Sequence, residues 1–178
     1  MSGRVPKVNA KVLRDSVRDR SEAVVVGFLR GQGFFGTDAS MLVDIELTML
    51  ILAALLFTIG WRLAVGKHYR AHRWTQTAAA ALNALVVLGS MVSSYLNYVL
   101  PGLPARLNRA YFAVPTVHAI VGLIAFFLGV FVVLRGNGLV PEALRFSNYK
   151  VFMRTSYALY MLATAIGVVV YLVWYGVL

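Results

Sequence analysis

The 178-residue sequence contains no cysteine. This excludes disulfide bonds, thiolate zinc sites, thioether-attached haem and iron–sulfur clusters held by cysteine. Acidic residues are also scarce, since 7 Asp and Glu stand against 17 Lys and Arg, a net charge of +10. Charged residues make up only 13% of the chain, about half of the ~25% found in soluble domains. These shortages argue against an ordinary soluble domain.

Hydrophobic residues are abundant instead, at 60% of the chain, against about 45–50% in soluble proteins. Four apolar stretches reach the ~20 residues that a helix needs to cross a bilayer, at about 41–65, 74–99, 115–134 and 149–177. The predicted fold class is therefore an all-α integral membrane protein. We expect a four-transmembrane-helix bundle over residues 41–178, preceded by a basic N-terminal extension over residues 1–40.

The N-terminal extension has two parts. Residues 1–22 are polar and basic and contain no apolar core of a signal peptide, so no cleavable signal is expected. Residues 23–29 are apolar but too short to span a membrane. We expect them to lie at the membrane interface, with Phe34 and Phe35 as anchors.

Lys and Arg residues gather beside two of the three predicted loops. Eight flank the first and third loops, whereas two lie in the second. The positive-inside rule places the eight in the cytoplasm and both termini outside, although seven more in the N-terminal tail favour the opposite orientation. Because these residues border apolar spans, we expect them to meet anionic lipid or a partner protein, and no nucleic acid. The candidates for this role are Lys67, Arg70, Arg73, Lys150 and Arg154.

The second span carries polar side chains at intervals of seven residues, namely Gln76, Asn83, Ser90 and Asn97. This spacing stacks them along one helix face. Such groups are unfavourable in lipid, so we expect the face to look inward. Two interpretations stay open: interhelical hydrogen bonding that holds the bundle together, or a polar path or cofactor face.

The fourth span contains a seam with alternating steps of four and three residues. Its members are Met153, Tyr157, Tyr160, Thr164, Gly167, Tyr171 and Trp174. This spacing is typical of left-handed helix packing. The phenol hydroxyls need hydrogen-bond partners at membrane depth, and we expect the polar face of the second span to provide them.

Three histidines suggest a bound metal or haem. His68 and His72 are four residues apart, which suits a metal, but the basic residues around them repel cations and suit lipid phosphates or haem propionates better. His118 opens the third span from the opposite side. Helix rise separates His72 from His118 by about 30–35 Å, too far for both to ligate one haem.

His118 is predicted at the same membrane level as Asp44 and Glu46 of the first span. An ionisable residue within a span favours a functional role. The set could hold a metal ion, relay protons or ligate a pigment, whereas the simpler alternative is one buried hydrogen bond. No phosphate-binding loop, hydrolase elbow or zinc-protease motif is present, so we expect no catalytic activity.

Three segments resemble a bacterial family of small four-span membrane proteins of unknown function, the "four-twenty" family. They are HRWTQTAAAALNAL (72–85), VHAIVGLIAFFLG (117–129) and NYKVFMRTSYALYMLATAIGVVVY (148–171). One branch of that family is implicated in the maturation of haem–copper oxidases. The resemblance implies a bacterial cytoplasmic membrane protein in which His72 and His118, then Arg73, Asn83 and Arg154, are the residues of interest.

We therefore expect a non-catalytic accessory or assembly subunit of a bacterial respiratory or photosynthetic electron-transfer complex. The first alternative is an electron-transfer protein that binds haem or another tetrapyrrole through His118, His72 or His68. The second is a small transporter or proton channel that uses the polar face of the second span. The sequence does not identify the cofactor, and haem is possible without being required.

Overall fold

The computed structural model describes residues 18–19, 23–24, 26–28, 30–145 and 147–176. Most of the predicted basic tail, 1–17 and 20–22, lies outside the described residues. The chain divides into two compact units, Met1–Asp44 and Ile45–Leu178.

In the first unit, a loop over residues 31–40 closes around the carboxylate of Asp44. The backbone N–H of Phe35 donates to Asp44 Oδ2 at 2.8 Å, and that of Gly33 donates to the Ala39 carbonyl at 2.9 Å. Asp44 is fully buried, whereas the neighbouring rings of Phe34 and Phe35 are about half exposed. A side chain at residue 33 would collide with the Asp44 carboxylate, so this loop requires glycine there.

The described chain has four helical segments that are long and apolar enough to cross a membrane, which confirms the predicted fold class. They are α2 (Met41–Val65), a composite segment (Tyr69–Gly102), α5 (Ala110–Gly136) and α6 (Tyr149–Trp174). The first agrees with the predicted span. The second starts five residues earlier than predicted, because the basic stretch before Trp74 is already helical.

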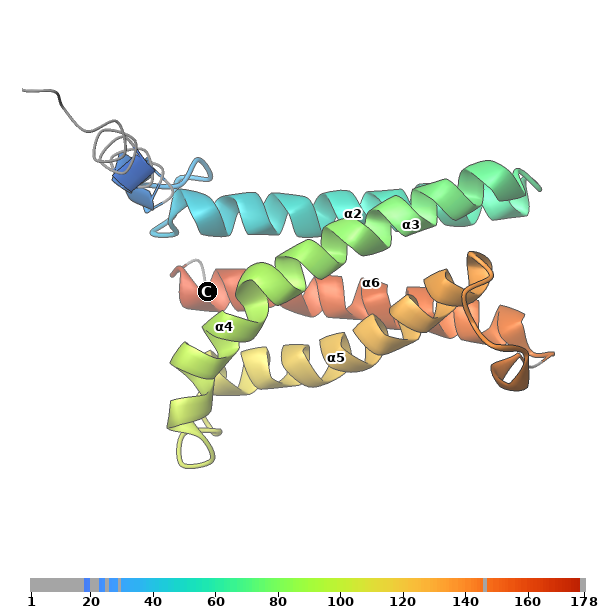
Figure 1. Ribbon diagram of the computed structural model, residues 1–178. Helices are drawn as coiled ribbons and strands as arrows, with labels where there is room; N and C mark the ends of the chain where they lie inside the picture. Colours follow the sequence, from blue (N-terminus) through green and yellow to red (C-terminus); the bar gives the residue numbers. More distant parts are fainter. Residues whose placement is uncertain (1–17, 20–22, 25, 29, 146, 177–178) are drawn as a thin grey trace, which may run out of the picture. The chain divides into compact units, whose positions relative to one another are not determined.

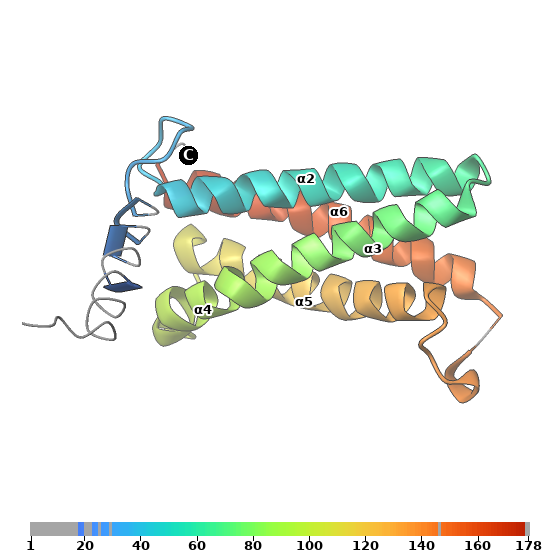
Figure 2. The ribbon, with the colours of Figure 1, turned by 45° about the horizontal axis from the view of Figure 1, so that its top comes forward.

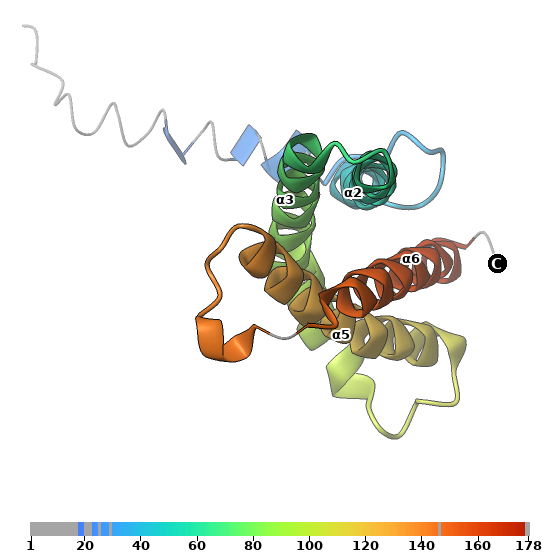
Figure 3. The ribbon, with the colours of Figure 1, turned by 90° about the vertical axis from the view of Figure 1, so that its right-hand side faces the viewer.

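From Ile45 onward, the helices follow the order α2, composite segment, α5, α6 around the bundle (Figure 3). A hydrogen bond joins each neighbouring pair: His72 Nδ1 with the Gly60 carbonyl (2.7 Å), Asn137 Nδ2 with Thr77 Oγ1 (3.1 Å), Tyr149 Oη with the Val132 carbonyl (2.7 Å), and Tyr157 Oη with Thr58 Oγ1 (3.0 Å). The α2–α3 and α5–α6 loops lie at one end of this unit, and the loop over 103–109 lies at the other (Figures 1 and 2).

The composite second segment is not a uniform α-helix. It begins as α3 (Tyr69–Val86), and two π-helical turns, Val87–Met91 and Tyr95–Val99, then flank the short α4 (Val92–Ser94). In each π-helical turn a backbone N–H bonds the carbonyl five residues earlier. The extra residue rotates the following side chains by about 100°. A spacing of seven therefore does not keep one face through this segment.

The helix ends at α2 and α5 have the same backbone geometry. At each end, two hydrogen bonds close the last turn around a residue with positive φ. That residue is Gly138 after α5, with φ 77°, but Lys67 after α2, with φ 63°. Glycine adopts this conformation without strain and lysine does not.

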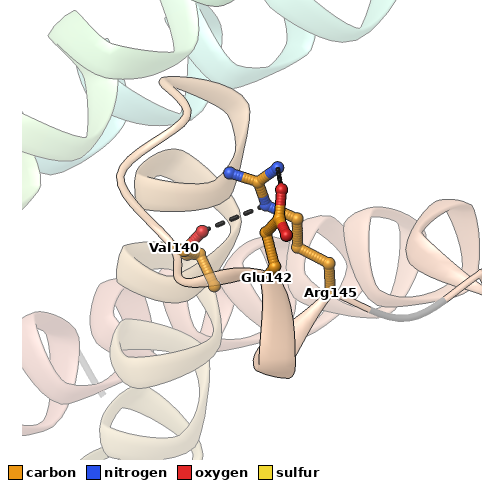
Figure 4. Close-up of polar contacts among 3 residues, drawn as sticks. All are labelled: Val140, Glu142 and Arg145. Atoms are coloured by element: carbon orange, nitrogen blue, oxygen red, sulfur yellow. Dashed lines mark hydrogen bonds and ion pairs between the residues drawn. The ribbon is translucent and has the colours of Figure 1, made fainter.

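The α5–α6 loop is held by its own side chains (Figure 4). Arg145 Nε donates to the Val140 carbonyl at 3.1 Å, and its guanidinium lies 3.9 Å from the Glu142 carboxylate. Glu142 also begins a short 3₁₀ turn, Glu142–Leu144. These contacts fold the loop back beside the end of α5.

The third span differs from the prediction at Pro115. We expected this proline at the first helical position, but α5 begins at Ala110 and contains Pro115 within it. Proline has no N–H to donate to the Tyr111 carbonyl four residues earlier. The indole Nε1–H of Trp174 donates to that carbonyl instead, at 3.1 Å. α6 thus supplies a donor to the carbonyl that the proline leaves without its intrahelical partner.

Candidate functional site

A cavity of about 450 Å³ lies among the four helices of the second unit. Its lining includes Phe57 of α2 and residues of α3, α5 and α6. Polar side chains contribute from two helices: His72, Gln76 and Asn83 on α3, and Ser156, Tyr157 and Tyr160 on α6. No lining residue is acidic. The polar face predicted on the second span therefore borders a cavity over its first half.

Some polar atoms of the lining are already engaged. Gln76 Nε2 donates to the Phe57 carbonyl at 3.1 Å, and Tyr157 shares a hydrogen bond with Thr58. The Tyr160 hydroxyl, in contrast, is buried beside the Thr164 side chain and forms no well-aligned hydrogen bond in the part of the chain that the structure describes. Because an unpaired buried hydroxyl is unfavourable, this part of the lining favours a ligand or water that accepts a hydrogen bond.

Two phenols of α6, Tyr157 and Tyr149, have hydrogen-bond partners outside the second span. We expected the polar face of the second span to pair with them. Tyr157 bonds Thr58 of α2 instead, and Tyr149 donates to a backbone carbonyl of α5. The amide of Gln76 in the second span donates instead to a backbone carbonyl of α2. Tyr160 and Tyr171 are both buried in the α6 seam.

The far half of the predicted polar face separates from the cavity. Ser90 lies in the first π-helical turn and is the hydrogen-bond partner of Glu46. Asn97 lies in the second turn and is exposed. The prediction of one inward face from Gln76 to Asn97 therefore fails at Asn97, because the π-helical turns rotate it away.

The end of the cavity nearest the α2–α3 loop is basic. Arg70 and Arg73 belong to the first turns of α3, line the cavity and are exposed to solvent. Lys67 and His68 are exposed in and beside the same loop. Lys150 and Arg154 are exposed on the first turns of α6 but do not contribute to the lining. Two of the five predicted lipid or partner residues therefore border the cavity.

His72 joins the cavity to α2. Its Nδ1 lies 2.7 Å from the Gly60 carbonyl, which can only accept, so Nδ1 carries the proton. The other nitrogen, Nε2, remains as an acceptor or ligand atom. A side chain at residue 60 would meet Gln76 Nε2 at 2.6 Å, so glycine allows this close approach of α2 and α3.

His118 occupies a different place, outside the cavity lining. Its Nδ1 donates to the Ala163 carbonyl of α6 at 3.0 Å. A side chain at Gly167 would come within 3.0 Å of His118 Cε1, so the glycine of the α6 seam makes room for the imidazole. His118 and His72 therefore contact different helices.

The three predicted metal ligands do not form a metal-binding cluster. Among the described residues, no group of three His, Asp or Glu side chains could hold a metal ion. The carboxylate of Asp44 accepts a backbone hydrogen bond from its own loop. Glu46 pairs with Ser90, and its Oε1 is buried without a partner in the described chain.

Tyr175 follows α6 at the end of the unit opposite the cavity's basic end. Burial, together with the nearby Glu46 carboxylate, raises its pKa to about 12. The ring centroid lies 5.1 Å from that of Tyr171. The hydroxyl is therefore protonated at any physiological pH.

Most of the lining residues were not predicted as site residues. Phe57, Ser156 and Asn137 carry no spacing signal, because each becomes part of the site through the packing of different helices. The lining residues with a periodic signal were Gln76 and Asn83 on the second span, and Met153, Tyr157 and Tyr160 in the predicted α6 seam. The sequence predicted lining residues that repeat along one helix, but not those that join the site only through tertiary contacts.

The fold and the cavity define a multi-pass helical membrane protein with a polar, cationic cavity in its bundle. Comparison with known proteins finds no matching family model, no similar curated protein and no similar solved structure.

Proposed function

We propose that this protein is a non-catalytic accessory or assembly subunit of a respiratory or photosynthetic electron-transfer complex in a bacterial cytoplasmic membrane. The observation that carries the proposal is the basic end of the second unit. Eight cationic side chains belong to its two loops and their flanks: Arg62, Lys67, Arg70, Arg73, Arg135, Arg145, Lys150 and Arg154. Among the described residues of this end, Glu142 is the only acid, and it pairs with Arg145.

A cationic surface at the edge of a membrane domain favours association with acidic protein surfaces and speeds the encounter. The positive-inside rule would place this end in the cytoplasm and both termini outside. The resemblance of residues 72–85, 117–129 and 148–171 to the "four-twenty" family supports a role in oxidase maturation.

The test combines gene deletion with purification from the native membrane. We expect deletion to lower the level of an assembled oxidase or photosynthetic complex, and the tagged protein to bring down its subunits. A Lys150→Gln/Arg154→Gln variant should lose those subunits, whereas Arg106→Gln/Arg109→Gln, at the opposite end, should retain them. Unchanged oxidase, pigment-complex and haem levels in the deletion strain would refute the proposal.

A second candidate is a tetrapyrrole-binding electron-transfer protein, which the lining of the cavity favours. His72 and Met153 both line it, and both are residue types that ligate haem iron. Arg70 and Arg73 suit the propionates. A Soret band in the purified protein that disappears in His72→Ala and persists in His118→Ala would support this candidate, and a colourless protein would remove it.

A further inference from the structure

The cavity combines features that point to an anionic ligand. Its lining contains Arg70, Arg73 and His72 but no acid. Arg70 and Arg73 are three residues apart, so they share one side of α3. In the described part of the chain neither guanidinium has a carboxylate partner, and Arg73 lies 6.0 Å from the ring of Trp74. Two unpaired guanidinium groups on one helix face can bind a single phosphate.

The position of these arginines identifies the source of the phosphate. They belong to the first turns of a helix that crosses the membrane, where lipid headgroups lie. Tyr69 and Tyr149, aromatic side chains typical of the membrane interface, line the cavity beside them. A phosphate at this level is most abundant as part of a phospholipid.

Farther from the arginines the cavity changes character. Ala80, Ala125 and Gly129, which are small, and the aromatic Phe126 provide an apolar wall. The buried hydroxyl of Tyr160 needs an acceptor. A glycerophospholipid offers both, since its ester carbonyls accept hydrogen bonds and the start of its acyl chains is apolar.

We propose that the cavity binds one anionic glycerophospholipid, with its phosphate on Arg70 and Arg73 and an ester carbonyl on Tyr160. This site does not depend on the proposed accessory function. It adds a stoichiometric lipid to the bundle, bound between α3, α5 and α6 rather than on the outer surface. The lipid fills the cavity and supplies the acceptor that the described chain lacks.

Native mass spectrometry of the full chain in mild detergent tests the proposal, with phosphatidylglycerol and phosphatidylcholine added in equal amounts. We expect one bound phosphatidylglycerol, preferred about tenfold over phosphatidylcholine, because both lipids offer the same phosphate but the choline cation of phosphatidylcholine is repelled by the basic side chains around the site. Arg70→Gln/Arg73→Gln should lower its occupancy by the same factor. The control Lys150→Gln/Arg154→Gln removes two charges from the same end but none from the lining, and should leave the occupancy unchanged.

Tyr160→Phe provides a test that survives any folding defect of the arginine variant. It removes only a hydroxyl that forms no well-aligned hydrogen bond in the described chain, so the lipid-free protein should unfold at the same or a higher temperature. The lipid affinity should nevertheless fall severalfold. Unchanged lipid affinity in this variant would show that no ester carbonyl bonds the Tyr160 hydroxyl, and would overturn the proposal.

Three further outcomes would overturn it. Equal loss of lipid in the control and the arginine variant would show diffuse attraction to surface charge. Displacement of the lipid by millimolar inorganic phosphate would identify a site for free phosphate. A tetrapyrrole retained in place of lipid would assign the cavity to that cofactor. None of these outcomes depends on whether the protein assists an electron-transfer complex.

Discussion

At the scale of single residues, one proline shows how the bundle compensates for a missing backbone donor. Pro115 cannot donate to the Tyr111 carbonyl, and Trp174 of α6 donates to it instead. The Trp174 and Tyr111 rings are also stacked, with centroids 5.3 Å apart. Pro115 thus removes one hydrogen bond within α5, and the carbonyl left over bonds Trp174 of α6.

This arrangement predicts a specific coupling between two substitutions. Trp174→Phe leaves the Tyr111 carbonyl without its donor and should lower the free energy of unfolding by about 1 kcal/mol. In a Pro115→Ala background the new N–H of residue 115 bonds that carbonyl, so Trp174→Phe should have a much smaller effect. A double-mutant cycle measured by reversible unfolding in detergent should give a coupling of about 0.5–1 kcal/mol. Additive effects would contradict the assigned bond.

The residue scale also shows what the sequence could not predict. The spacing of Gln76 and Asn83 correctly placed them on one face, and that face borders the cavity. Asn97 follows the same spacing but is exposed, since two π-helical turns shift the helix face before it. The residue pattern does not predict these turns. Gly60 gave no signal either, and Gly167 was predicted only as a member of the α6 seam, since each is needed for the close approach of a side chain from another helix.

At the scale of helices, the ends of α2 and α5 form a natural comparison. Both close with the same pair of hydrogen bonds around a left-handed residue, which is Lys67 in one and Gly138 in the other.

The boundaries of α2 were predicted from hydropathy alone, whereas the earlier start of α3 was not, because basic residues can be helical without being apolar. Hydropathy reports the part of a helix within lipid and not its full length.

The two helix ends predict stability changes of opposite sign. Lys67→Gly relieves the left-handed strain and should raise the free energy of unfolding by about 1 kcal/mol, whereas Gly138→Ala should lower it by a similar amount. Lys67→Ala is the control, since it removes the charge and keeps the strain. Thermal unfolding in detergent measures all three. A stabilisation by Lys67→Ala equal to that by Lys67→Gly would assign the effect to the side chain rather than the backbone.

At the scale of the whole molecule, the second unit is polarised. Basic residues flank the α2–α3 and α5–α6 loops at one end. At the other end, the only basic residues in the loop over 103–109 are Arg106 and Arg109. The number of spans and the fold class followed from composition and hydropathy, because a bilayer restricts a chain to few solutions. The cavity could not be predicted from composition and hydropathy, because its volume depends on how the helices pack against one another.

The absence of cysteine allows a direct test of the membrane orientation, because any single introduced cysteine is the only thiol in the chain. In intact bacterial cells, a membrane-impermeant maleimide should label Arg106→Cys and spare Lys67→Cys and Glu142→Cys. Permeabilised cells should label all three, which controls for accessibility. The reverse pattern in intact cells would place both termini in the cytoplasm and show that the basic N-terminal tail determines the orientation.

The short connection between α2 and α3 has a consequence for how the protein is made. Only residues 66–68 separate the two helices, so they leave the ribosome one directly after the other. The polar groups that α3 brings into the membrane find acceptors on α2, at the carbonyls of Gly60 and Phe57. The two helices can therefore enter the bilayer together as a hairpin in which the His72 imidazole and the Gln76 amide are already hydrogen-bonded, before α5 has been synthesised.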